Sequence, residues 1–105
     1  MRHPYRIPFG EMAGESPAQY MSAKAATVGS HRLRLVEFRK GFQEVDWCRL
    51  AHTGYVLEGR LHLAFPGQEL TLEAGDGLHI PLGDAHRHKL TPLTDRVALV
   101  LFDPA

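Results

Sequence analysis

The chain has 105 residues, which fits one domain, and its twelve basic residues balance twelve acidic ones. The formal charge of zero excludes the basic excess typical of nucleic-acid-binding proteins, and the longest apolar run, Val97 to Phe102, is too short to cross a bilayer. A single cysteine, Cys48, excludes an intrachain disulfide. With no signal-like N-terminal stretch, we expect a cytoplasmic protein without nucleic-acid or membrane partners.

The first thirty residues differ in composition from the rest, and we expect them to form an N-terminal arm before a barrel of residues 31–105. Ser16 to Gln19 has the order of a helix start, with Ser at the N-cap and Pro at the first helical position. Gly29 and Ser30 would end such a helix early, and a helix this short is marginal. Residues 17–27 therefore predict either a short helix or an extended edge strand.

Beyond the arm, apolar and polar residues alternate in short runs that glycine and proline separate. Leu33 and Leu35 alternate with Arg32 and Arg34, which is the pattern of a half-buried strand. The same alternation lies at residues 60–65 and 69–73, and short extended runs lie at 55–57, 78–81 and 86–90. The run at 97–102 is apolar on both faces, as in a covered strand. About seven short strands with no helices between them predict an antiparallel sandwich or barrel.

Two segments carry a recognisable motif. In Gly75 to His86, the spacing of Gly75, Pro81, Gly83 and His86 matches the second sequence motif of the cupins. The run Tyr55 to Gly59 resembles the end of the first cupin motif. Fifteen residues separate Gly59 from Gly75.

The resemblance to cupins covers roughly residues 33–103, and it implies an all-β fold, a single antiparallel jelly-roll β-barrel. One departure is Leu90, which stands where the second motif usually ends in Asn.

A metal site is the main functional implication of the resemblance. Cupins commonly place two histidines and a glutamate ahead of the glycine of the first motif, and one histidine in the second motif. Counted back from Gly59, the positions of the two histidines hold Asp46 and Cys48, and the position of the glutamate holds His52. The second motif supplies His86. The resemblance therefore implies a metal ion held by Asp46, Cys48, His52 and His86.

These residue types suit such a site, because thiolate, imidazole and carboxylate all bind transition metals. A thiolate favours zinc, and next iron, over magnesium or calcium, so we expect one divalent transition metal ion per chain. Each residue also has an ordinary structural explanation. Cys48 would be a small buried side chain, His52 a core histidine and Asp46 the cap of a turn.

His88 is the predicted catalytic residue. It lies two positions beyond His86, so in a strand both side chains face the same way. His88 would move a proton as a general base. Alternatively, it would be a further metal ligand, or it would hydrogen-bond to a metal ligand and orient it.

The sequence thus predicts a metal-binding cupin of unassigned activity. We expect a small metalloenzyme, an oxygenase, isomerase or lyase, acting on a small molecule in the barrel. The alternative is a non-catalytic sensor or carrier module. We also expect a homodimer, because a small barrel leaves unpaired sheet edges and the arm is long enough to reach a second subunit.

Overall fold

The structure is a computed structural model that describes residues 4–105, so the first three residues of the expected arm lie outside it. Nine strands and two short 3₁₀ helices make up its regular structure. They are η1 (Phe9–Glu11), β1 (Glu15–Ala18), β2 (Met21–Val28), β3 (His31–Arg39), β4 (His52–Glu58), β5 (Arg60–Phe65), β6 (Gln68–Glu73), β7 (Gly77–Ile80), η2 (Asp84–His86), β8 (Lys89–Pro92) and β9 (Arg96–Pro104).

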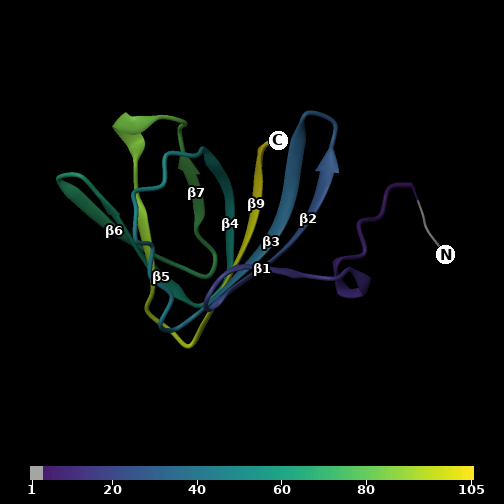
Figure 1. Cartoon of the computed structure of the whole chain (residues 1–105), viewed down its shortest axis with the longest axis horizontal. Helices are drawn as coiled ribbons and strands as arrows, with labels where there is room; N and C mark the ends of the chain where they lie inside the picture. The colour runs from purple at the N-terminus through teal and green to yellow at the C-terminus, as the bar shows by residue number, and fades with distance from the viewer. Residues whose placement is uncertain (1–3) are drawn as a thin grey trace.

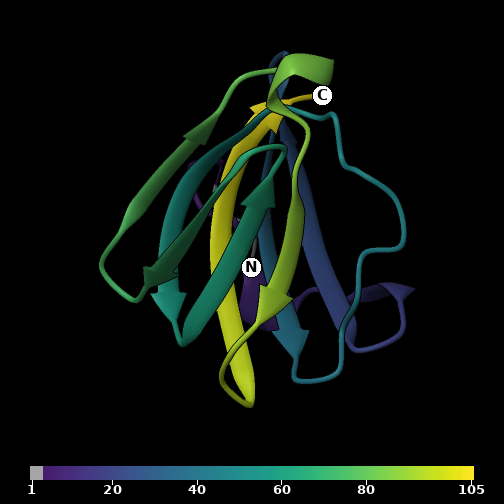
Figure 2. The ribbon, with the colours of Figure 1, turned by 90° about the vertical axis from the view of Figure 1, so that its left-hand side faces the viewer.

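The strands form two antiparallel sheets that lie opposite one another (Figures 1 and 2). The larger sheet has the order β1-β2-β3-β9-β4-β7, and the smaller has the order β6-β5-β8. The predicted all-β jelly-roll fold is confirmed. None of the helices in the described part of the chain is long and apolar enough to cross a membrane.

Residues 15–28, expected within the arm, form two strands of the larger sheet. β2 pairs with β3 along its whole length, from Met21 opposite Phe38 to Val28 opposite His31. The hydroxyl of Ser16 donates to the carbonyl oxygen of Met21 at 2.9 Å and so closes the β1–β2 turn instead of capping a helix. The strand alternative is confirmed and the helix is wrong, because continuous pairing with β3 outweighs a marginal local helix signal.

The core lies between the two sheets. The most deeply buried side chains are Val36, Val56 and Val97 on the larger sheet and Leu61 on the smaller one. Each strand turns alternate residues toward the core, and these apolar faces bury one another. β9 lies between β3 and β4 in the middle of the larger sheet, in agreement with its apolar sequence.

At Gly54, the backbone of β9 leaves no room for a side-chain carbon on β4. A Cβ atom at this position would overlap the carbonyl oxygen of Val100 and lie 2.9 Å from its carbonyl carbon. Both are backbone atoms of a paired strand, so only a shift of one strand makes room. We expect Gly54→Ala to lower the free energy of unfolding by about 1–3 kcal/mol, as overpacking does elsewhere.

Urea denaturation measures this effect, and Gly10→Ala is the matched control. A Cβ atom on Gly10 in η1 meets nothing within 4 Å, so that variant should stay within about 0.5 kcal/mol of the wild type. Equal stability of the Gly54 variant and the wild type would show that the two strands separate without cost.

Candidate metal centre

Cys48 and His88 face each other across an isolated antiparallel β-bridge. The amide of Cys48 donates to the carbonyl oxygen of His88 at 2.8 Å, and the amide of His88 donates back at 3.0 Å. Residues directly opposite in an antiparallel pair turn their side chains to the same side. The bridge therefore places the thiol and the imidazole next to each other, although forty positions separate them in the sequence.

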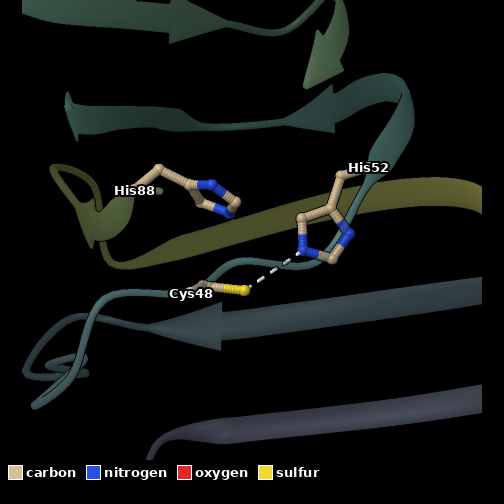
Figure 3. Close-up of side chains that lie close together, drawn as sticks. All are labelled: Cys48, His52 and His88. Carbon is tan, nitrogen blue, oxygen red and sulfur yellow. Dashed lines mark hydrogen bonds between the residues drawn. The ribbon is translucent and has the colours of Figure 1, made fainter. Parts of the chain in front are cut away.

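His52, the first residue of β4, completes the group. One ligand atom from each of Cys48, His52 and His88 lies within 4.8 Å of the others, and the three side chains point toward one another (Figure 3). Sγ of Cys48 is 3.7 Å from Nε2 of His52. The two imidazole rings meet edge to face, with 5.3 Å between their centroids. His88 is buried, and the other two side chains are partly buried.

Both imidazoles are held through Nδ1. Nδ1 of His52 lies 3.0 Å from Oδ2 of Asp103, and Nδ1 of His88 lies 3.1 Å from the carbonyl oxygen of His86. Both oxygens accept a hydrogen bond, so each Nδ1 donates. Nε2 is then the ring nitrogen that can bind a metal ion. Metal-binding histidines nearly always have such an oxygen partner, which orients the ring. The arrangement suits metal coordination through Nε2.

Asp103 is a buried carboxylate with three partners. Besides His52, its Oδ2 accepts from Nη2 of Arg34 at 3.1 Å, and its Oδ1 accepts from the amide of Thr53 at 3.0 Å. Burial raises the pKa of Asp103, but the hydrogen bonds from His52, Thr53 and Arg34 outweigh it, and the pKa lies below its usual value. Asp103 therefore carries a negative charge beside His52 at neutral pH.

The thiol of Cys48 is strongly acidic. Hydrogen bonds with His52 and then His88 lower the pKa of Cys48 to about 5, although burial acts in the opposite direction. Burial lowers the pKa of each histidine. Hydrogen bonds to Cys48 and to the oxygen at Nδ1 raise the pKa by more than burial lowers it, so both pKa values lie above the usual one. Cys48 is thus a thiolate at neutral pH, the form that binds metal ions.

The three side chains open onto a cavity of about 190 Å³ between the sheets. Much of its wall is apolar and includes Val36, Phe38, Leu61, Leu63, Leu99 and Leu101. Its other polar members are Arg34 and Glu44. Oε1 of Glu44 accepts from the amide of Leu90 at 2.9 Å, and burial raises the pKa of the Glu44 carboxyl. The cavity therefore combines a hydrocarbon wall with a few convergent polar groups, as small-molecule sites do.

Of the four expected ligands, the structure brings Cys48 and His52 together and adds His88, the predicted catalytic residue. Asp46 and His86 are exposed and lie outside this group in the described part of the chain. His86 ends the turn η2, and the strand expected from residue 86 begins only at Lys89. The turn directs the side chain of His86 to solvent, while its carbonyl oxygen holds His88.

Three polar residues of the site were not predicted from the sequence: Arg34, Glu44 and Asp103. Arg34 looked like the solvent side of a half-buried strand. Asp103 directly follows the apolar run of β9, and this interruption of a covered strand by a carboxylate was the available signal. Glu44 lies in the segment between β3 and β4, where the sequence has no strong pattern.

A family model described as "Cupin domain" matches residues 49–102, about half of the chain. The chain belongs to the cupin family. This cupin is 31% identical over 111 residues to a curated relative from Bacillus subtilis (strain 168), quercetin 2,3-dioxygenase. The match covers 96% of this chain and 33% of the relative, so the chain spans about a third of that protein's length.

Solved structures of other proteins share the fold of this cupin. KdgF from a Halomonas species superposes with a TM-score of 0.74 at 21% identity, over 91% of each chain. A cupin-2 domain-containing protein from Shewanella frigidimarina NCIMB 400 gives a TM-score of 0.68 at 26% identity, over 84% of each chain. Both likenesses support the jelly-roll assignment.

Proposed function

We propose that this cupin holds one divalent transition metal ion, zinc first and iron next, on Cys48, His52 and His88. The observation that carries the proposal is the anchoring of both imidazoles at Nδ1, which leaves Nε2 as the ligand atom of each ring, with Nε2 of His52 3.7 Å from Sγ of the acidic Cys48. Three protein ligands leave one position of a tetrahedral ion open, as in catalytic zinc sites. The thiolate and imidazole donors favour zinc or iron over harder cations.

We further propose that the protein is a small metalloenzyme whose substrate enters the cavity. A bound ion at this site would polarise a substrate oxygen. The cavity of about 190 Å³ is smaller than the roughly 300–1,000 Å³ of sites for drug-sized ligands, so the proposed substrate is smaller than such ligands. Among oxygenase, isomerase and lyase activities, the name of the Bacillus relative supports oxygenase first.

Within this cavity we assign proton transfer to Glu44. Sequence reasoning gave this role to His88, but His88 now belongs to the proposed ligand set. Burial raises the pKa of Glu44, and a carboxyl group with a raised pKa holds and releases a proton closer to neutral pH.

Elemental analysis of protein purified without added metal tests the metal proposal. We expect close to one zinc or iron ion per chain, and protein free of metal after gentle purification would contradict it.

The alternative function is a non-catalytic sensor or carrier. Incubation with a small-molecule extract separates the two, because an enzyme depletes a compound in a metal-dependent manner, whereas a carrier binds it without loss.

We also propose that the chain forms a homodimer in the cytoplasm. β1 and β7 are the edge strands of the larger sheet, and the outer face of that sheet carries Leu33 paired with Phe102. Phe102 is 44% exposed, and unpaired edges and apolar faces favour association. Light scattering at micromolar concentration should give twice the chain mass, and a monomer would contradict the proposal. The unpaired, acidic thiol of Cys48 fits a reducing compartment.

Asp103 orients His52, so its loss should weaken the metal site without removing a ligand. We expect Asp103→Asn to lower metal affinity about 10- to 100-fold, the usual cost of losing such a partner. The amide carries no charge and holds the imidazole less strongly. Competition with a chelator of known affinity measures the change. Asp95→Asn, an exposed position between β8 and β9, is the control and should bind metal like the wild type.

A further inference from the structure

Arg34 on β3 is a cavity residue with a buried donor atom that has no hydrogen-bond partner among residues 4–105. It contributes to the cavity wall, and its side chain is only 16% exposed. A guanidinium group has five N–H donors, and the ion pair with Asp103 uses Nη2. Nε of Arg34 is buried and has no hydrogen-bond partner in the described part of the chain. Buried donors without partners are uncommon in folded proteins, and each calls for an explanation.

The charges around Arg34 favour an additional anion. Asp103 is shared between Arg34, His52 and the amide of Thr53, so it is not a dedicated counter-ion for the arginine. Arg32 lies two positions before Arg34 on the same side of β3, and its Nε is likewise buried without a partner among residues 4–105. Arg32 is opposite Asp103 in the β3–β9 register, so this face of β3 carries two arginines where β9 supplies one carboxylate.

The position of Arg34 relative to the metal centre is equally specific. Oδ2 of Asp103 contacts both Nη2 of Arg34 and Nδ1 of His52, so a single oxygen atom links the guanidinium to a proposed ligand. A small molecule anchored on Arg34 would thus lie beside the metal centre. The rest of that molecule would meet hydrocarbon, because Val36, Phe38 and Leu101 line the same cavity.

We propose that the cavity takes a small carboxylic acid whose carboxylate is bound by Arg34 and whose hydrocarbon part packs against the apolar wall. Arginine binds carboxylates well, because its planar fork of donors matches their geometry. The inference deepens the proposed function by naming the substrate class of the same site, and it rests on that proposal.

Glu44 lies in the same cavity and would repel an anionic ligand if it were charged. Its Oε1 is occupied by the amide of Leu90, and burial raises the pKa of its carboxyl, which favours the neutral form. The raised pKa makes the charged, repelling form of Glu44 less favourable than that of a carboxyl group in water, and Arg34 is the permanently charged cation of the cavity wall.

The test uses benzoate and benzamide, which have nearly the same shape and differ in charge. Isothermal titration of the purified full chain should show benzoate binding about tenfold or more tightly than benzamide. The preference should persist after the metal is removed with a chelator, because Arg34 supplies it. Arg34→Gln should abolish the preference. Arg34→Lys, which keeps the charge beside Asp103, should retain part of it.

Arg60→Gln on β5 is the control, because Arg60 is exposed and lies outside the cavity wall. It should keep the full preference. Equal binding of both compounds to the wild type would overturn the inference, as would a preference that survives Arg34→Gln in folded protein. A preference present only in metal-loaded protein would also overturn it, because the ion would then bind the carboxylate. A preference in protein that never contains metal would instead support the inference and contradict the metal proposal.

Discussion

Replacing Cys48, His52 or His88 by alanine is expected to empty the metal site. Loss of a residue that merely orients a ligand costs about 10- to 100-fold in affinity, so loss of a ligand should cost at least about 100-fold. Each variant should fall from close to one ion per chain to less than about a tenth of that after dialysis against a moderate chelator. Elemental analysis of folded protein, with the fold checked by circular dichroism, gives the measurement.

The controls for this experiment come from the other two residues that the cupin resemblance implied. His86→Ala keeps the backbone carbonyl that holds His88, so the variant should retain its metal. Asp46→Ala changes an exposed side chain outside the group and should also retain it. If His86→Ala empties the site while His88→Ala leaves it full, the ligand set derived from the motif spacing is right and the one proposed from the geometry is wrong.

Mild peroxide treatment is expected to strip the metal from the wild-type protein. With a pKa of about 5, Cys48 is a thiolate at neutral pH, and thiolates are the species that peroxide oxidises. Oxidation to the sulfinate or sulfonate removes the soft donor from the site. Metal release, followed with a colorimetric chelator, should rise in step with the mass increase on Cys48.

Cys48→His is the matched variant for the peroxide experiment. It replaces the thiolate by an imidazole, which binds the same metals but is not on the cysteine oxidation ladder. We expect it to bind metal and to keep it under the same treatment. Unchanged metal content in wild-type protein whose Cys48 has gained oxygen by mass would show that this sulfur is not a ligand.

The fold was largely predictable, but the direction of β3 was not. Leu33 and Leu35 alternate with Arg34, the pattern of a half-buried strand, in which apolar side chains ordinarily face the core. The structure turns Arg34 and Val36 inward, toward the cavity and the core, and leaves the leucines only partly buried. Alternation fixes which residues share a face, but not which face is inside. That choice follows from pairing with β9, where Arg34 lies opposite Leu101.

The site was predictable in part for a related reason. Cys48 and His52 were found from local spacing, since they lie four positions apart. His88 rather than His86 joins them, because the backbone bridge to Cys48 fixes its place. Asp103 lies 51 positions from His52, and their contact exists only through the β4–β9 pairing. Local patterns do not contain contacts of this range.

The place of β9 in the larger sheet has a consequence for how the chain is made. β9 is the ninth strand in the sequence, yet it lies between β3 and β4, which are not hydrogen-bonded to each other. During synthesis the ribosome therefore releases all eight other strands before the one that joins the two halves of the sheet. Until then, β3 and β4 each have an unpaired edge that another nascent chain can bind. Asp103 arrives with β9, so His52 acquires its carboxylate partner only after β9 has joined the sheet.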